Sequence, residues 1–200
     1  MAEDEHYFSA DPSVPFRRMP VTASVWGHEL SLTSGSGVFA QGRLDVGTAV
    51  LFRETSAPSG GRVLDLGCGY GVIGLAIAAA VPGATVTGVD VNERAVLLAN
   101  ENAAALGLAD RFTAATPSGV PAVATYDELW SNPPIRIGKA ALHELLLTWL
   151  PRLVLGGRAV LVVGKNLGAD SLQRWLGEEG YPTARVASAK GFRVLETRRS

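Results

Sequence analysis

The sequence predicts an α/β fold with a mostly parallel β-sheet and helices on both of its faces. The first observation is a regular alternation of short apolar segments with longer helical ones from residue 62 onward. The second is a set of stop signals between these segments, such as Pro82-Gly83 and Gly107. Strands that alternate with helices are joined by right-handed crossovers into a parallel sheet.

The expected strands are short apolar runs at residues 62–66, 85–90, 111–115, 126–131 and 158–164. The expected helices have apolar residues at helical spacing and lie at residues 45–56, 72–80, 92–106, 139–150 and 169–179. Residues 181–188 and 191–198 predict a closing hairpin around Lys190-Gly191. Ligands of such folds bind beyond the carboxyl ends of the strands, so the functional site is expected there.

The N-terminal part is less regular. Residues 1–22 contain three prolines and are expected to form an irregular arm. Residues 24–32 alternate in part and predict a single strand before the glycine-rich turn TSGSG. Because there is no repeat or low-complexity linker, we expect one domain over residues 23–200 after this arm.

Composition narrows the class of protein. The chain has 200 residues, 47% of them hydrophobic and 18% charged, which is typical of a soluble globular protein. Its net charge of −1 gives no overall basic field for nucleic acid, although a local patch would be enough. The single cysteine, Cys68, excludes an internal disulfide, and the three histidines show no metal-ligand spacing. With no signal peptide or membrane-length apolar run, we expect a cytoplasmic protein without metal or membrane.

A glycine loop, DLGCGYGVIG, follows the first of the alternating strands at residues 65–74. Its glycines allow a sharp turn and close approach of a ligand to the backbone. Gly69, Gly71 and Gly74 also match the G-x-G-x-x-G pattern of dinucleotide-binding folds, so an NAD-dependent oxidoreductase is an alternative. A carboxylate at Asp65 favours the ammonium of S-adenosylmethionine over a pyrophosphate. Asp90 ends the next strand, where an acidic side chain takes ribose hydroxyls.

The segment Asn132-Pro133-Pro134 follows the apolar strand YDELWS. Consecutive prolines fix the backbone, and the residue before a proline is held extended. An exocyclic amino group or amide is a poor nucleophile because its lone pair is delocalised. The side-chain oxygen of Asn132 and the carbonyl of Pro133 are expected to grip its two N–H groups and so favour the transition state of methyl transfer.

Together these motifs resemble the class I S-adenosylmethionine-dependent methyltransferases, and more narrowly the small-domain family that includes the 16S ribosomal RNA guanine-N2 methyltransferases. The resemblance spans nearly the whole chain. It rests on HYFS (6–9), SGVFAQGRLDVGT (36–48), VLDLGCGYGVIGLA (63–76), VDVN (89–92), NPPIRIGK (132–139) and KGFRVLE (190–196). It implies a single-domain Rossmann-like fold with a seven-stranded sheet whose last strand is antiparallel.

The resemblance also implies roles for individual residues. The cofactor-binding residues would be Asp65, Gly67, Gly69, Gly71, Asp90, Val91, Asn92, Asp45, Gly47, Thr48 and Thr116. Within this set, Asp90 would bind the ribose, and Val91 or Asn92 would flank the adenine. Asn132 and Pro133 would be catalytic, and the substrate-binding residues would be Pro134, Ile135, Phe39, Arg136 and Lys139.

The sequence departs from the family pattern at three places. Ala115-Thr116 stands where many relatives have Ser-Asp, whose Asp meets the adenine amino group. Ile135 stands where an aromatic residue often stacks on the target, so stacking is left to Phe39 or Tyr7. The N-terminal half that helps two-domain relatives to grip RNA has no counterpart in the given sequence.

The predicted function is therefore methylation of an exocyclic amino group, with guanine N2 in ribosomal RNA as the expected target and RNA as the partner. The target base has to leave its stack to reach Asn132. Methylation of a protein glutamine or of a small-molecule amine is the first alternative. A non-catalytic cofactor-binding module is another, and the sequence leaves monomer and homodimer open.

Overall fold

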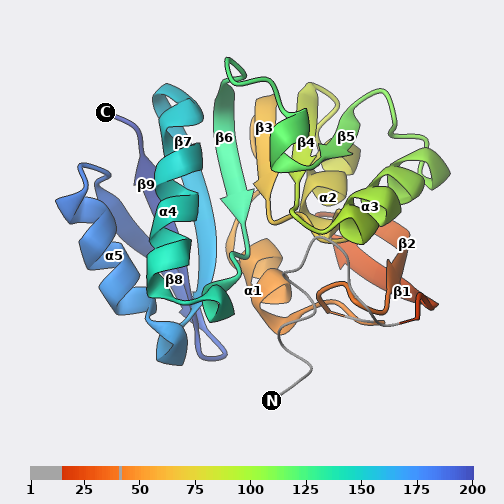
Figure 1. Cartoon of the computed structure of the whole chain (residues 1–200), viewed down its shortest axis with the longest axis horizontal. Helices are drawn as coiled ribbons and strands as arrows, with labels where there is room; N and C mark the ends of the chain where they lie inside the picture. The colour runs from red at the N-terminus through yellow and green to blue at the C-terminus, as the bar shows by residue number, and fades with distance from the viewer. Residues whose placement is uncertain (1–14, 41) are drawn as a thin grey trace.

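A seven-stranded sheet lies at the centre of the protein (Figure 1). The computed structural model describes residues 15–40 and 42–200. The strands, in chain order, are β3 (Gly61–Leu66), β4 (Ala84–Val89), β5 (Phe112–Ala115), β6 (Tyr126–Ser131), β7 (Leu153–Gly164), β8 (Thr183–Ala189) and β9 (Phe192–Arg198). Their order in the sheet is β5-β4-β3-β6-β7-β9-β8. The last strand, β9, runs in the direction opposite to the other six strands of this sheet, which confirms the predicted architecture.

Helices cover both faces of the sheet. They are α1 (Val46–Glu54), α2 (Val72–Ala80), α3 (Glu93–Ala105), α4 (Lys139–Trp149) and α5 (Ala169–Glu178), with short 3-10 turns at Pro117–Gly119, Ile135–Ile137, Leu150–Arg152 and Lys165–Leu167. Successive residues of a strand point to opposite faces. In β7, Val160 and Val162 join the apolar cluster beneath α1, α2 and α3, whereas Leu161 and Val163 join the cluster beneath α4 and α5.

The strand order reverses between β3 and β6. From β3 the chain proceeds outward through β4 and β5, and it then returns to place β6 on the other side of β3. In parallel α/β sheets a ligand crevice lies at this switch point, beyond the carboxyl ends of the strands. The glycine loop follows β3 and the Asn-Pro-Pro segment follows β6, so the fold brings these two motifs to the same edge.

The N-terminal region differs from the prediction. Instead of one strand at 24–32 after an arm that reaches residue 22, residues 18–35 form an antiparallel hairpin of β1 (Arg18–Val25) and β2 (His28–Gly35). Residues 1–14 of the expected arm lie outside the described part of the structure. Trp26 and Gly27 make its two-residue turn, with φ of 47° and 84°. Positive φ at both central residues is the geometry of a type I′ turn, but Trp-Gly is not among its usual dipeptides. The sequence therefore did not indicate this turn. Strand β7 also differs from the prediction, because it begins at Leu153 rather than at residue 158.

A buried asparagine attaches this hairpin to the rest of the fold. Asn102 of α3 is 2% exposed. Its side-chain oxygen accepts from Thr33 N at 2.8 Å, and its Nδ2 donates to Thr33 O and to Tyr70 O, each at 2.9 Å. Because Tyr70 belongs to the glycine loop, one side chain couples β2, α3 and the loop.

We expect Asn102→Leu to lower the free energy of unfolding by about 2–4 kcal/mol. The change leaves one buried N–H and two carbonyls without their partners, and buried unsatisfied groups are costly. Leu97→Ala, on a half-exposed residue of the same helix, is the matched control and should stay within about 0.5 kcal/mol of the wild type. Urea unfolding measures both variants, and equal stabilities would contradict the bridging role of Asn102.

Candidate active site

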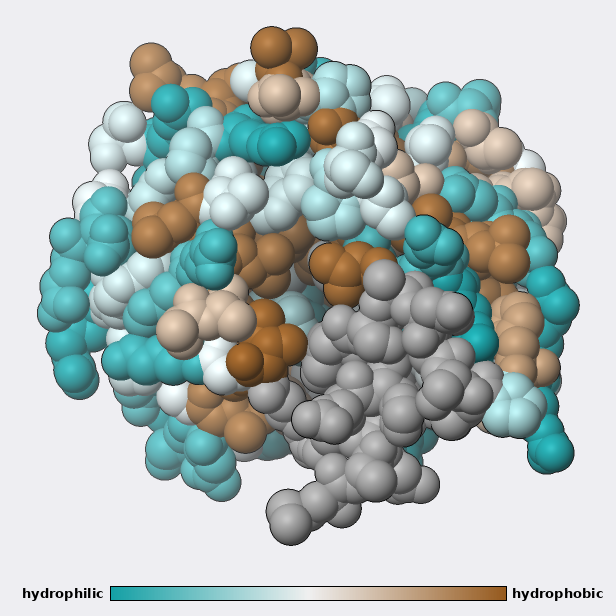
Figure 2. Space-filling model, viewed as in Figure 1, coloured by the Kyte–Doolittle hydropathy of each residue, from teal (hydrophilic) through white to brown (hydrophobic). Residues whose placement is uncertain are grey.

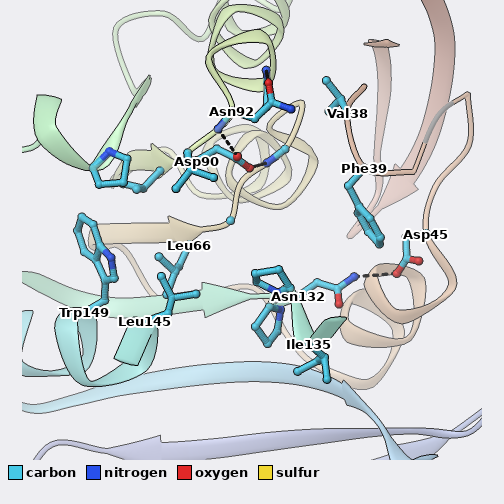
Figure 3. A pocket seen from close by; sticks show the side chains of 18 of the residues that line it. Val38, Phe39, Asp45, Leu66, Asp90, Asn92, Asn132, Ile135, Leu145 and Trp149 are labelled. Carbon is cyan, nitrogen blue, oxygen red and sulfur yellow. Dashed lines mark hydrogen bonds between the residues drawn. The ribbon is translucent and has the colours of Figure 1, made fainter. Parts of the chain in front are cut away.

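A cavity of about 260 Å³ opens at the strand edge between the glycine loop and the Asn-Pro-Pro segment. Figure 3 shows side chains from both sides of the sheet edge converging on it. Figure 2 shows apolar side chains in a hollow near the middle of this face, with polar ones toward its margins. The lining includes the following residues predicted for the site: Phe39, Asp45, Gly67, Gly69, Asp90, Val91, Asn92, Asn132, Pro133, Pro134 and Ile135.

The glycine loop forms one wall of this cavity. Gly69 has a φ of 54°, and a Cβ added to it would meet no atom within 4 Å. The backbone is therefore open at this point to a ligand that approaches closely, which fits the predicted cofactor. Gly71 does not line the cavity, because it begins α2, where a Cβ would lie 3.1 Å from the Cβ of Ala99. Its role is the packing of α2 against α3.

Asp90 fixes the loop from the end of β4. Its Oδ2 accepts from Gly69 N and its Oδ1 from Asn92 N, both at 2.9 Å. Burial raises the pKa of Asp90, while the backbone N–H groups that it accepts act in the opposite direction. A carboxylate has about four acceptor sites, so Asp90 can accept a ligand hydroxyl in addition to these backbone groups. Asp90 lines the cavity, so its position fits the predicted ribose contact.

Asn92 has a mainly structural position. Its side-chain oxygen accepts from Arg94 N and Ala95 N and so caps α3, while its Nδ2 donates to Gly37 O at 2.6 Å. These bonds join α3 to the segment after β2. Although Asn92 lines the cavity, its neighbour Val91 is 45% exposed and presents the apolar surface that an adenine ring would need.

Asp65 lies elsewhere than expected. Its side chain is fully buried and does not line the cavity; Oδ2 accepts from Gly74 N at 2.8 Å. Oδ1 has no hydrogen-bond partner in the described part of the chain. Leu64 and Leu66 point to the α4 side of β3, and Leu66 lines the cavity, so alternation directs Asp65 toward α2. Asp65 thus supports the start of α2 rather than lining the cavity.

The start of α1 supplies the opposite wall, but only one of its three predicted residues lines the cavity. Asp45 does so and also caps α1, because its Oδ2 accepts from Thr48 N at 3.0 Å. Gly47 packs against Phe192, where an added Cβ would lie 2.9 Å from the ring. Thr48 is buried, with 3% exposure. Neither Gly47 nor Thr48 therefore has the direct pocket contact that was predicted.

Asn132 lies between the two walls. Its Nδ2 donates to Asp45 Oδ2 at 2.7 Å and to Thr48 Oγ1 at 3.0 Å. Figure 3 shows the first of these bonds, between Asn132 and Asp45. An amide nitrogen has two hydrogens, and both are used here. The side-chain oxygen of Asn132 is consequently the polar atom of this amide that remains for a ligand.

The prolines after Asn132 form the floor of the site. The carbonyl of Pro133 accepts from Ile135 N at 2.8 Å and retains one lone pair for another donor. Pro134 and Ile135 line the cavity, and Ile135 also lines an adjoining cavity of about 170 Å³. Phe39 is 44% exposed, and its ring points toward Asn132 (Figure 3). Phe39 therefore has the position expected of a group that stacks on a target.

The remaining predicted residues lie around this centre. Thr116 does not line the cavity; the adjacent Pro117 does, so the contact after β5 is apolar. Lys139 lines the adjoining cavity rather than the main one. The side chain of Arg136, as well as Tyr7 and the HYFS motif, lies outside the described part of the structure.

Sequence reasoning missed the apolar part of the lining. The missed residues are Val38, Leu66, Val89, Ala95, Pro117, Leu145, Trp149, Gly164, Leu167 and Phe192. Trp149 is only 2% exposed and belongs to the core, yet it also borders the cavity. The motif KGFRVLE was a usable signal for Phe192, but the others look like ordinary core residues in the sequence.

Several arginines lie far from the cavity or already have acidic partners. Arg198 and Arg199 follow the end of β9 that lies beside the amino-terminal half of β7, at the opposite edge of the sheet. Arg18 pairs with Glu101 at 2.8 Å, and Arg193 pairs with Asp170 at 3.3 Å. At the cavity edge, Lys139, Lys165 and Lys190 are exposed.

Within residues 15–40 and 42–200, no group of three or more His, Cys, Asp or Glu side chains is arranged to hold a metal ion. In the same residues, no helix combines the length and apolar character needed to cross a bilayer.

Comparisons with known proteins identify the family of the chain. The chain matches the family model "Methyltransferase small domain" over residues 29–196. The uncharacterized protein YbxB of Bacillus subtilis (strain 168) is 33% identical over 198 residues, which is 98% of each chain. Ribosomal RNA small subunit methyltransferase C of Pseudomonas aeruginosa (strain LESB58) is 36% identical over 178 residues, covering 86% of this chain and 52% of the relative.

The solved structure of T. thermophilus 16S rRNA N2 G1207 methyltransferase (RsmC), in complex with AdoMet and guanosine, aligns with a TM-score of 0.79 and 25% identity. The alignment covers 94% of this chain and 52% of that one. The chain thus spans about half the length of the two ribosomal RNA methyltransferases. Fold, cavity and comparisons together define an S-adenosylmethionine-dependent methyltransferase. The chain belongs to the methyltransferase small domain family, as its motifs predicted.

The buried carboxylate of Asp65 makes stability depend on pH. Burial raises the pKa of Asp65 to about 7; the nearby Asp90 carboxylate adds to this effect, and the hydrogen bond from Gly74 opposes it. The folded state therefore holds a proton that the unfolded chain releases near pH 4. The stabilisation is complete below pH 4 and is lost as pH rises through about 7.

We therefore expect the wild type to lose up to about 4 kcal/mol of unfolding free energy relative to Asp65→Asn between pH 4 and pH 8. Denaturant unfolding of both proteins across this range measures the difference. Asp110→Asn, at an exposed carboxylate, provides the matched control. A difference between wild type and Asp65→Asn that does not change with pH would contradict the raised pKa.

Proposed function

We propose that the protein methylates an exocyclic amino group, with guanine N2 in ribosomal RNA as the substrate. The observation that carries this proposal is the Asn132 amide, which has both hydrogens bound and its oxygen left for a ligand beside the glycine loop. An oxygen acceptor on a fixed backbone suits an amine donor. The site offers no comparable feature for a hydride acceptor.

The chain's own groups would act on the nitrogen of the target. S-adenosylmethionine supplies a methyl group on a sulfonium. The Asn132 oxygen and the free lone pair of the Pro133 carbonyl would each accept one N–H of the target amine. These bonds strengthen as the nitrogen becomes pyramidal and gains positive charge, so they favour the transition state over the ground state. The proton is released to water once the nitrogen is cationic.

The cofactor would lie along the glycine loop. Gly67 and Gly69 would approach its amino acid part through the backbone, and Asp90 would accept the ribose hydroxyls. Val91 and Pro117 would provide apolar contacts for the adenine, because no acidic side chain stands after β5. Phe39 and Ile135 would contact the target base. Asp65 and Gly71 would support the loop and α2 without touching the ligand.

RNA as the partner is supported by three lysines beside the cavity. Lys139 lines the adjoining cavity, which shares Ile135 and Leu167 with the main one. Lys165 follows Gly164, and its backbone N–H donates to Gly191 O at 2.7 Å, which brings it close to Lys190. Among the described residues, none of these lysines forms an ion pair. Exposed unpaired cations suit a phosphate backbone, whose contacts position a nucleic acid.

Methyl transfer to cell fractions tests the substrate directly. The purified protein is incubated with tritiated S-adenosylmethionine and fractionated lysate, and the labelled polymer is digested with nuclease or protease. We expect label in ribosomal RNA that nuclease releases as N2-methylguanine. Label released only by protease would overturn the RNA proposal in favour of glutamine methylation.

Two substitutions separate catalysis from cofactor binding. Asn132→Ala should lower kcat by about 10²-fold or more, because one acceptor of the transition state is lost. Its affinity for S-adenosylhomocysteine, measured by calorimetry, should stay within about three-fold of the wild type. Asp90→Ala should show the reverse pattern, with weaker binding of S-adenosylhomocysteine. Wild-type turnover by Asn132→Ala would rule out the proposed role of Asn132.

A further inference from the structure

We infer that Asp45 and Thr48 are positioning residues for Asn132 and act on methyl transfer only through its side-chain amide. This inference rests on the proposed role of Asn132 as an acceptor for the target amine. It assigns Asp45 and Thr48 a function different from the cofactor contact that the motif GRLDVGT suggested. Both residues belong to the start of α1, some 85 residues before Asn132 in the chain.

The contacts hold one orientation of the amide. Nδ2 of Asn132 lies 2.7 Å from Asp45 Oδ2 and 3.0 Å from Thr48 Oγ1. Rotation of the amide by 180° would place its oxygen against the carboxylate oxygen, and two acceptors at that distance repel each other. Without Asp45 and Thr48, the amide nitrogen could face the cavity as readily as the oxygen. An amide nitrogen that faced the cavity would be a hydrogen-bond donor opposite the N–H donors of the target amine, so it could not accept from them.

The carboxylate also changes the strength of the acceptor. A hydrogen bond to an ionised group is stronger than a neutral one, and hydrogen bonds in a chain polarise each other. Donation from Nδ2 to Asp45 shifts electron density toward the oxygen of Asn132. That oxygen then becomes a better acceptor for an N–H group that gains positive charge in the transition state.

The position of Asp45 is itself well fixed. Its Oδ2 also accepts from Thr48 N at 3.0 Å as the N-cap of α1, and Thr48 is buried. Helix α1 packs against β7 and β9. Gly47 lies against Phe192 of β9 with no room for a side chain. The amide of Asn132 is thus held by a helix end that is anchored in the core.

The double role of Asp45 allows a clean test. Asp45→Ser keeps an N-cap oxygen for α1 but is too short to reach Asn132. Asp45→Asn keeps the cap and an acceptor without the charge. At position 48, Thr48→Val removes Oγ1, whereas Thr48→Ser retains it.

We expect Asp45→Ser and Thr48→Val to lower kcat by about 10-fold each, with Asp45→Asn intermediate and Thr48→Ser close to the wild type. The assay uses tritiated S-adenosylmethionine and the fraction that accepts label. Calorimetric affinity for S-adenosylhomocysteine should change by less than about three-fold in all four variants. Thermal unfolding checks that the capped helix is retained.

A double-mutant cycle then asks whether Asp45 acts through Asn132. In an Asn132→Ala background, Asp45→Ser should change kcat by less than about two-fold, because the amide that it positions is absent. Equal losses in both backgrounds would overturn the inference, as would a loss of S-adenosylhomocysteine affinity as the main effect of Asp45→Ser. If Asn132→Ala retains wild-type turnover, the proposed function fails instead. If only Asn132→Ala is impaired, the inference about Asp45 and Thr48 fails alone.

Discussion

The hydrogen bond from Asn132 Nδ2 to Asp45 Oδ2 joins the two parts of the fold that make the site. Asn132 follows β6, which lies on one side of the switch point. Asp45 is the N-cap of α1, which packs against β7 and β9. Without this bond the cavity would still exist, but the Asn132 amide would have no fixed orientation. The two prolines that follow restrict the backbone conformation at Asn132, and the Asp45 carboxylate fixes the orientation of the Asn132 side chain. The chemical character of the site depends on both restraints.

The glycine loop is held by a similar arrangement of buried acceptors. Asp90 binds the backbone of the loop at Gly69, Asp65 binds the start of α2 at Gly74, and Asn102 binds Tyr70 from α3. A backbone with few side chains is flexible by itself, so these contacts give the loop a defined shape before a ligand arrives. The cost is visible at Asp65, where burial raises the pKa and leaves one oxygen without a partner among the described residues. The buried Asp65 thus lowers the stability of the fold but helps to form the binding loop in advance.

Much of the fold and part of the site could be predicted from the sequence. Apolar runs with stop signals located the strands and helices of the central sheet, and strand ends located Gly69, Asp90 and Asn132. The direction of a side chain was harder. Asp65 lies near the end of β3, as expected, but its side chain is on the α2 face of the sheet. Successive strand residues point to opposite faces, and the sequence alone did not show which face Asp65 occupies. The hairpin of β1 and β2 was missed because Trp26-Gly27 does not look like a type I′ turn. Trp149 and Phe192 look like core residues, and only the tertiary structure shows that they also border the cavity.

The most direct test of this account is a crystal structure of the protein with S-adenosylhomocysteine bound. The account predicts that Nδ2 of Asn132 stays within hydrogen-bond distance of Asp45 and Thr48. The side-chain oxygen of Asn132 should face open space beside the sulfur of the ligand, at the place of the target nitrogen. A structure in which the amide has left Asp45, or in which the ligand's sulfur lies away from Asn132, would contradict it.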